Sequence, residues 1–326
     1  MITPKISIIV PIYGVEKYIE RCVRSLFEQT LSDIEYIFVN DCTPDKSIEI
    51  LKKVIREYPN RKETIKLITL SCNKGVAYAR NVGLANSTGD YIGWVDPDDW
   101  VEKDMFQLLY NQAVEFNAEL VWCDYTENTP DKERLVSQKA VEHSRDLLRC
   151  IIIDDFLPLS TKIIKRDLFL HNKIRFIDGA NMSEDRNVCI KVLGVTTKIK
   201  YLSRGLYHYN ISNNASLMHI FNRKRISDYV VNMIDAVKFL SNTTVEWLSE
   251  EDLMEYKLLA KNQYLMSLDL KSLMRWSLYF PEVNNNANIR CLPLNNRILA
   301  YLAMHHQWCL LRIVLKLYKT KLKLVG

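Results

Sequence analysis

The first 125 residues alternate short, almost wholly apolar runs with stretches whose apolar residues recur every three or four positions. Apolar runs of this length are typical of strands buried in a parallel sheet. They are Ile6–Val10, Tyr36–Val39, Ile65–Leu70, Tyr91–Val95 and Glu119–Asp124. The stretches with helical spacing are Val15–Phe27, a segment that begins at Asp45 or Ser47, Ala77–Ala85 and Lys103–Phe116. This alternation predicts an α/β fold, in which helices cover both faces of a mostly parallel sheet.

Beyond residue 125 the pattern is mixed and becomes mostly helical. Pro130–Gln138 is polar and predicts a loop or irregular hairpin, and Leu159–Phe169 predicts a strand that passes into a helix. The remaining elements that we expect are helices over His143–Ile153, Ser183–Leu193 and much of Phe221–Trp276, a linker over Pro281–Asn296 and one amphipathic helix over Arg297–Lys323. The chain therefore divides into an α/β domain over residues 1–218, a helical extension over 219–282, and a linker with a C-terminal helix over 283–326.

Positive charge is concentrated at the C-terminal end. The chain has 44 Lys and Arg against 39 Asp and Glu, a net charge of +5, yet from Val283 onward it has no acid. The seven bases of that segment are Arg290, Arg297, Arg312, Lys316, Lys319, Lys321 and Lys323. Residues 1–282 therefore carry 37 bases against 39 acids, which argues against a nucleic-acid partner. The basic amphipathic helix could lie on an anionic membrane surface or pack on the α/β domain with a solvated basic edge, and the sequence leaves both open.

The eight cysteines form no CxxC pair and have wide, irregular spacings, which makes a zinc ribbon or a disulfide framework improbable. Cys22, Cys123 and Cys189 lie in apolar surroundings and are expected to be reduced core residues. We find neither a secretory signal nor an apolar stretch long enough to span a bilayer. The expected location is the cytoplasm, and the basic helix leaves open a peripheral position on the inner face of the plasma membrane.

Acidic residues gather where the predicted strands end. The motif VDPDDW places Asp96, Asp98 and Asp99 within four residues after the fourth strand. Carboxylates this close repel one another unless a positive charge lies among them, and a divalent Mg²⁺ or Mn²⁺ ion is the simplest one. The alternative is that Asp98 and Asp99 only cap a helix that starts after Pro97.

Three further polar residues lie at the same predicted edge. Asp41, after the second strand, could accept an N–H from a uracil or guanine base, or could simply form a turn before Thr43-Pro44. Arg80, on the helix after the third strand, could pair with a phosphate or brace the acids, or could be an ordinary surface arginine. Lys74 is equally ambiguous.

These motifs resemble a known family. The segments ISIIVPIYGVEKYIERCVRSLFEQT, YIFVNDCTPDKS and NKGVAYARNVGLANSTGDYIGWVDPDDW, within Lys5–Asp124, resemble the nucleotide-sugar half of the family 2 glycosyltransferases of the GT-A fold, of the bacterial polysaccharide-biosynthesis type. The resemblance implies that 1–125 is the nucleotide-sugar half and 126–218 the acceptor half of one catalytic domain. It implies a nucleotide-sugar donor, a UDP-sugar first of all, and a saccharide or lipid-linked saccharide acceptor. It also implies a Mn²⁺ or Mg²⁺ cofactor.

The same resemblance assigns roles to residues of this half. Pro11, Tyr13 and Asp41 would surround the nucleotide base. Asp96 and Asp98 would form the DxD pair, with Asp96 near the ribose or diphosphate, Asp98 on the metal and Asp99 adjacent to it. One departure concerns the second strand, where the usual Asp-Asp-Gly-Ser is replaced by Asn40-Asp41-Cys42-Thr43.

The resemblance also points beyond the DxD segment. The family has a Glu-Asp pair at the start of a helix, and Glu184-Asp185 fits it, with Asp185 as general base and Glu184 in support. An acid in a first helical turn stays ionised because of the helix dipole, although Ser183 followed by two dipole-matched acids would look the same. Gly205–Ser216 resembles the aromatic element that closes the donor site. It carries Asn210 in place of a frequent arginine, and His208, which would either reach the metal or pack as an ordinary histidine.

The resemblance implies metal-dependent transfer of a sugar with inversion at the anomeric carbon. One general base is enough for such a single displacement. Two other classes remain open at this stage. A nucleotidyltransferase also uses an α/β sheet and acidic metal ligands, but usually needs an early glycine-rich basic loop, and this chain has 9 glycines in all. A non-catalytic nucleotide-sugar-binding scaffold would not need Asp98 and Asp185.

Overall fold

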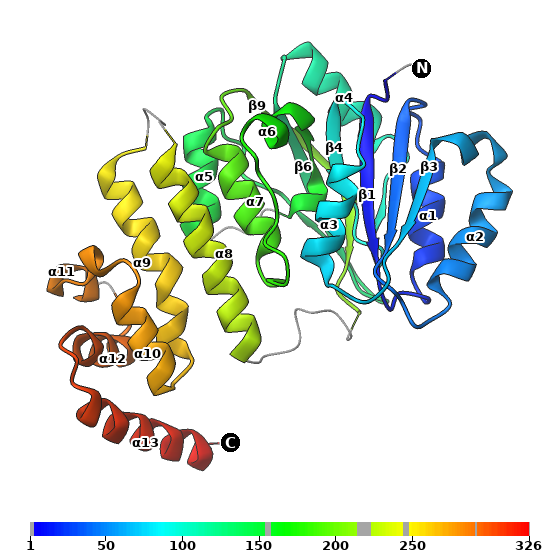
Figure 1. Cartoon of the computed structure of the whole chain (residues 1–326). Coiled ribbons are helices and arrows are strands. Elements are labelled where there is room, and N and C mark those ends of the chain that lie inside the picture. The colour runs from blue at the N-terminus through cyan, green and yellow to red at the C-terminus, as the bar shows by residue number, and fades with distance from the viewer. Residues whose placement is uncertain (1–2, 154–157, 214–222, 244–247, 291, 326) are drawn as a thin grey trace. The chain divides into compact units, whose positions relative to one another are not determined.

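The computed structural model describes residues 3–153, 158–213, 223–243, 248–290 and 292–325. The chain forms two compact units, residues 1–220 and 221–326, and each is described by itself. Figure 1 traces both units, with the sheet in the N-terminal one and helices in the described residues of the C-terminal one.

The N-terminal unit contains one nine-stranded sheet in the order β3-β2-β1-β4-β8-β6-β9-β5, with β7 paired to β6. Its strands are β1 (Ile6–Ile12), β2 (Ile34–Asn40), β3 (Ile65–Thr69), β4 (Tyr91–Trp94), β5 (Trp100–Val101), β6 (Leu120–Asn128), β7 (Glu133–Val136), β8 (Lys162–Lys165) and β9 (Ile199–Asn210). Strands β1 to β4 pair in parallel, as predicted. The other half of the sheet is mixed, because β8 runs antiparallel to both β4 and β6 while β9 runs parallel to β6. The predicted α/β sheet flanked by helices is confirmed.

The helices of this unit are α1 (Ile19–Phe27), α2 (Ser47–Glu57), α3 (Val76–Ala85), α4 (Met105–Glu115), α5 (Ser144–Ile153), α6 (Arg166–His171) and α7 (Glu184–Leu193). Side chains alternate along a strand, so β1 contributes to two layers. Ile6, Ile8 and Val10 lie in the cluster that includes α1 and α4. Ile9 faces α3, which comes so close at Gly83 that a Cβ there would lie 2.3 Å from Ile9 Cγ2. Helices therefore cover both faces of the strands that end at the acidic residues.

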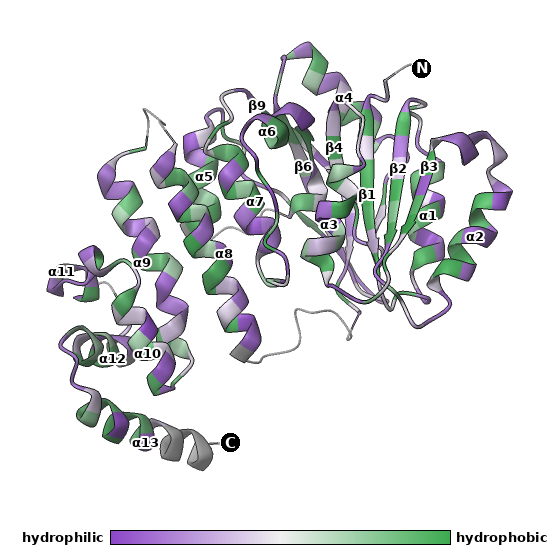
Figure 2. Ribbon diagram, viewed as in Figure 1, coloured by the Kyte–Doolittle hydropathy of each residue, from purple (hydrophilic) through white to green (hydrophobic). Residues whose placement is uncertain are grey.

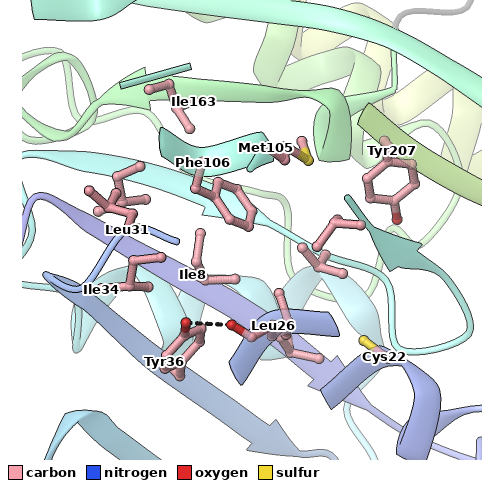
Figure 3. Close-up of a cluster of buried hydrophobic side chains, with 14 of the residues drawn as sticks. Ile8, Cys22, Leu26, Leu31, Ile34, Tyr36, Met105, Phe106, Ile163 and Tyr207 are labelled. Carbon is pink, nitrogen blue, oxygen red and sulfur yellow. Dashed lines mark hydrogen bonds between the residues drawn. The ribbon is translucent and has the colours of Figure 1, made fainter. Parts of the chain in front are cut away.

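The core under α1 and α4 is continuous, and Figure 3 shows part of it, with Phe106 beside Ile8 and Leu26 below. Tyr36 is fully buried there, and its hydroxyl donates a hydrogen bond of 2.6 Å to the carbonyl oxygen of Leu26. Cys22, Cys123 and Cys189 are buried free thiols, as predicted. This packing fixes β1, β2 and β4 relative to one another, and therefore fixes the loops at their ends.

The C-terminal unit is helical and has a core of its own. Its helices are α8 (Arg223–Asn242), α9 (Glu250–Met266), α10 (Leu270–Leu278), α11 (Asn286–Arg290), α12 (Leu294–Met304) and α13 (Trp308–Val325). Helix α9 begins with a capping box between Ser249 and Asp252. The core includes Trp276 of α10, Leu299 of α12 and Leu311 of α13. Figure 2 shows that green, hydrophobic positions recur along these helices.

Two predictions for this unit differ from the structure. The stretch expected to be a linker, Pro281–Asn296, contains a 3-10 turn at Pro281–Val283, all of α11 and the start of α12. Val283, Ile289 and Leu292 within it are buried, which is not expected of a linker. The single helix expected over Arg297–Lys323 is instead α12 and α13. They are separated at His306, whose φ of +55° cannot continue a right-handed helix. Within the described residues, no helix is long and apolar enough to cross a membrane.

Candidate active site

The ends of β2, β1 and β4 are neighbours in the sheet and carry the predicted site residues. In open α/β sheets, ligands bind beyond the carboxyl ends of the parallel strands. Pro11 lies inside β1 and is buried, whereas the Tyr13 side chain just beyond it is 50% exposed. The N–H of Asp41 donates to the carbonyl of Ile12 at 3.0 Å, so the end of β2 is tied to the end of β1.

The Asp41 carboxylate fastens the loop that follows β3. It is buried, and its two oxygens accept the backbone N–H groups of Lys74, at 2.7 Å, and Gly75, at 2.8 Å. Each oxygen keeps a further acceptor lone pair for a ligand. The Lys74 ammonium lies 5.1 Å from the centre of the Tyr78 ring. Cys42, at the position of the family's glycine, has a φ of +55°, so the turn takes the left-handed conformation without a glycine.

The start of α3 packs against the segment before α7. Gly75 has a φ of +89°, and a Cβ there would lie 2.3 Å from the side-chain amide of Asn181. The Asn181 Oδ1 accepts the Ala77 N–H at 3.1 Å. This contact brings residues that are more than 100 positions apart in the sequence to the same end of the sheet.

Arg80 joins the DxD turn to the Glu-Asp pair. Its guanidinium is buried and donates to Glu184 Oε1 at 2.6 Å and to Asp96 Oδ1 at 2.8 Å. The interpretation of Arg80 as a surface residue is therefore wrong. Burial lowers the pKa of Arg80, but Asp96, Glu184 and Asp185 outweigh it and leave that pKa above its ordinary value. The pKa of Glu184 is raised to about 7, first of all by burial. The positive charge of Arg80 lowers this pKa and the negative charge of Asp185 raises it.

Asp185 lies next to this ion pair, in the first turn of α7. Its side chain is half-buried, and Oδ1 accepts the N–H of Arg186 at 2.7 Å. Ser183 has a φ of +59° and its hydroxyl makes no capping hydrogen bond, so the serine-cap interpretation of this turn is wrong. The carboxylate lies among the first amides of a helix, where the dipole stabilises a negative charge.

The two aspartates of the DxD turn that follow Pro97 have different surroundings. Asp98 is half-buried, and its Oδ2 accepts from the Asn213 side-chain amide at 2.8 Å. Burial and the nearby Asp96 raise the pKa of Asp98. Asp99 is 1% exposed, and its oxygens accept the Tyr207 hydroxyl at 2.5 Å and the Asn210 N–H at 2.8 Å. Burial, Asp98 and Asp96 raise the pKa of Asp99 well above its ordinary value.

This turn is not a helix cap. Strand β5 begins directly after it, at Trp100, and the next helix, α4, begins only at Met105. The alternative in which Asp98 and Asp99 merely cap a helix is therefore wrong. The turn is instead attached to the last strand of the unit, β9, which contains Tyr207 and Asn210.

His208 packs beside the turn. Its Nε2 lies 2.9 Å from Glu102 Oε1, and its Nδ1 lies 3.3 Å from the side-chain nitrogen of Asn128. The ring stacks on Trp100, with 5.0 Å between the ring centres and 9° between the planes. Both ring nitrogens have partners in the chain, which favours the packed histidine over the metal ligand.

Among the residues that the structure describes, no three His, Cys, Asp or Glu side chains are arranged to hold a metal ion by themselves. The charge balance nevertheless fits a cation. Asp96, Glu184 and Asp185 all interact with the buried guanidinium of Arg80, and repulsion from Asp96 contributes to the raised pKa of Asp98. Mg²⁺ and Mn²⁺ are commonly held by one or two carboxylates together with phosphate oxygens of a substrate. Asp98 fits that pattern.

The sequence did not point to Asn181, Asn213 or Tyr207 individually. Tyr207 and Asn213 lie in the aromatic, asparagine-rich segment that was singled out as a whole, and only their contacts with Asp99 and Asp98 distinguish them. Asn181 had no signal beyond its place three residues before Glu184.

Comparison with known proteins agrees with this architecture. Residues 7–171 match Glycosyl transferase family 2. The uncharacterized glycosyltransferase EpsJ of Bacillus subtilis (strain 168) is 33% identical over 263 residues, which cover 78% of this chain and 74% of EpsJ. The sheet and the matches define the class of the protein, a glycosyltransferase. Within that class, the chain belongs to glycosyl transferase family 2.

Two solved structures share the fold. The structure of S. aureus TarS 1–349 in complex with UDP-GlcNAc has a TM-score of 0.73 at 22% identity, and the match covers 97% of this chain and 92% of that one. The mannosyltransferase PcManGT from Pyrobaculum calidifontis, in complex with GDP-Man and Mn²⁺, has a TM-score of 0.51 at 13% identity, over 93% of this chain and 88% of that one.

Proposed function

We propose that the chain transfers a sugar from a nucleotide-sugar to an acceptor hydroxyl with inversion at the anomeric carbon, in a metal-dependent reaction. The observation that carries the proposal is the ion-paired bridge from Asp96 through Arg80 to Glu184. It places the turn that would receive the donor beside the helix start that would supply the base, Asp185.

The donor would lie over the ends of β1, β2 and β4. Pro11 and Tyr13 offer an apolar and aromatic surface for the base, and Asp41 offers acceptor oxygens for a ring N–H. Lys74 is a further candidate at that edge, and Asp96, the first acid of the DxD turn, would lie near the ribose or diphosphate. A UDP-sugar is the first candidate because a protein of the same fold, TarS, is known in complex with UDP-GlcNAc.

Asp98 would hold Mn²⁺ or Mg²⁺ together with the donor diphosphate. The bound ion would supply Lewis-acid stabilisation of the leaving diphosphate. We propose Asp98 rather than Asp99 as the ligand, because Asp98 is half-buried whereas Asp99 is 1% exposed and is held by β9 through both carboxylate oxygens. The Mn²⁺ in the PcManGT complex makes this ion a suitable first choice for assays.

Asp185 would act as general base. Its carboxylate takes the proton of the acceptor hydroxyl as the hydroxyl oxygen forms a bond to the anomeric carbon. The bond from that carbon to the diphosphate breaks, and the electron pair leaves with the nucleoside diphosphate. One displacement at one carbon inverts its configuration, by analogy with inverting glycosidases.

The acceptor class that we propose is a saccharide or lipid-linked saccharide, at the inner face of the plasma membrane. The support for this setting is the basic C-terminal segment together with the buried free thiols of Cys22, Cys123 and Cys189.

The experiment that tests the proposal compares the Asp185→Asn variant with the wild type, both as the full chain. We expect turnover to fall by about 10²–10⁴-fold, the usual worth of general-base help, while Mn²⁺-dependent thermal stabilisation by UDP is kept. The matched control is Asp146→Asn, an exposed acid in the first turn of another helix, α5.

A donor screen with UDP-, GDP- and dTDP-sugars identifies the nucleotide. Turnover in Asp185→Asn at the wild-type rate would contradict the base assignment. Donor binding by the wild-type chain without transfer or hydrolysis would instead favour the non-catalytic scaffold.

A further inference from the structure

Helices α12 and α13 are apolar on two separate faces. One face belongs to the core of the C-terminal unit, in which Leu299 and Ala303 of α12 and Leu311 and Leu315 of α13 are buried. A helix on the surface of a globular unit normally needs only one such face.

The second apolar face is exposed. On α12 it consists of Leu294, Ile298 and Tyr301, which are 69%, 43% and 50% exposed. On α13 it consists of Leu310, Ile313 and Leu317, which are 49%, 57% and 64% exposed. Within each helix these residues are three or four positions apart, so they lie along one side of it. We refer to these six residues as the exposed stripes.

Exposed bases accompany the exposed stripes. Arg297 of α12 and Arg312 and Lys316 of α13 are exposed beside them. In the sequence, the 44 residues from Val283 to Gly326 contain seven bases and no acid. Exposed apolar side chains flanked by bases, in a segment of sequence that contains no acid, are typical of a helix that lies in a membrane interface.

We propose that the exposed stripes of α12 and α13 dock on an anionic lipid surface. Apolar side chains there would enter the boundary between headgroups and acyl chains, and the bases would face the negative headgroups. A second copy of the chain fits this surface less well, because pairing the same segment with itself would bring like charges together with no acid to oppose them.

Docking would hold the enzyme where a lipid-linked acceptor is found. That consequence rests on the proposed function, whereas the docking itself does not. The two can therefore fail separately in experiment.

The test is flotation of the full chain with vesicles of phosphatidylcholine alone and of phosphatidylcholine mixed with phosphatidylglycerol. We expect the chain to float with the anionic vesicles, to float far less with the neutral ones, and to be released by salt. The variants Ile313→Ser/Leu317→Ser and Arg312→Gln/Lys316→Gln should each lose most of the vesicle-bound fraction.

Matched controls come from the N-terminal unit. Val114→Ser/Phe116→Ser removes two other exposed apolar side chains, and Lys52→Gln/Lys53→Gln removes two other exposed bases. Both should float like the wild type, and UDP with Mn²⁺ should stabilise all four variants as it does the wild type. If UDP with Mn²⁺ did not stabilise the wild type, that result would count against the donor site and not against docking.

Two results would overturn the proposal. One is equal flotation of the wild type and the stripe variants. The other is a wild type that does not bind vesicles and forms a dimer in light scattering, whereas Ile313→Ser/Leu317→Ser is a monomer. A second copy of the chain would then cover the exposed stripes.

Discussion

At the scale of single residues, the site is organised by the buried guanidinium of Arg80. Arg80 binds Asp96 of the DxD turn and Glu184 of α7 at the same time. These partners lie 16 and 104 positions further along the sequence. Asp185 adds a further negative charge nearby. Repulsion from Asp96 adds to burial in raising the pKa of Asp98, whereas the raised pKa of Glu184 comes first from burial and is opposed by the attraction of Arg80.

Removal of Arg80 should therefore be costly. Arg80→Met leaves two carboxylates without their partner, and breaking a buried ion pair in this way typically costs about 3–5 kcal/mol of the free energy of unfolding. Urea denaturation of the wild type and the variant measures this loss of stability. The control is Arg24→Met, whose ion pairs with Glu20 and Glu57 are exposed and should contribute less than about 1 kcal/mol. Equal losses in the two variants would contradict the bracing role of Arg80.

Glu184 gives a pH dependence with a defined sign. Burial raises its pKa to about 7 from an ordinary value of 4.5, so the folded chain holds a proton that the unfolded chain releases. The stability that this group contributes is fully present below about pH 4.5 and is lost as the pH rises through about 7. Relative to Glu184→Gln, the free energy of unfolding of the wild type should fall across that interval, measured by urea denaturation with a metal chelator. A rise of this free energy with pH would mean that the ion pair with Arg80 outweighs the effect of burial on Glu184.

At the scale of elements, β9 determines the position of the DxD turn. The Tyr207 hydroxyl accepts the Asp96 N–H at 3.3 Å and donates to Asp99, while Asn210 binds Asp99 through its N–H and Asn213 binds Asp98. The turn is thus attached at several points to β9 and to Asn213 just beyond it, more than 100 positions later in the chain. We infer that Asp99 is a positioning residue.

Tyr207→Phe tests this attachment. The ring remains, but one buried oxygen of Asp99 loses its donor, which should cost about 1–3 kcal/mol of the free energy of unfolding. The affinity for UDP in the presence of Mn²⁺ should also fall, since the turn would be held less firmly. Tyr209→Phe, on the same strand, is the control, because no hydrogen bond of its hydroxyl is recorded among the described residues. If both variants bind UDP like the wild type, the attachment does not serve the site.

The elements near the N-terminus could be predicted from sequence because each strand there is a compact apolar run followed at once by a polar residue. The acids at the strand ends followed from that pattern alone. The contacts of Arg80 and Asn181 could not be predicted, because they join segments about 100 residues apart and no local pattern records them. The left-handed conformation of His306, which divides the predicted C-terminal helix in two, was not predicted either, because neither glycine nor proline marks that position.

At the scale of the whole molecule, the two units have separate cores. The cluster around Phe106 and Tyr36 and the cluster around Trp276 and Leu299 have no residue in common. Each unit therefore buries its own apolar surface, and damage to one core should leave the other intact.

Leu299→Ala should act on the C-terminal unit alone. The side chain is fully buried, and its truncation should cost about 2–5 kcal/mol. The neighbouring Ile298→Ala, 43% exposed, should cost far less. Calorimetric melting without lipid should show the loss, while UDP with Mn²⁺ should still stabilise the N-terminal unit. Loss of that stabilisation in Leu299→Ala would show that the two units are coupled.

The central claim is that the acids at the strand ends, with Asp98 foremost, bind a divalent ion and through it an activated sugar. Titration calorimetry of UDP into the wild type and Asp98→Ala, with Mn²⁺ and with a chelator, tests it most directly, with the exposed loop variant Asp131→Ala as control. We predict that Mn²⁺ strengthens UDP binding to the wild type and to Asp131→Ala but not to Asp98→Ala. Unchanged affinities for UDP and Mn²⁺ in Asp98→Ala would contradict the account.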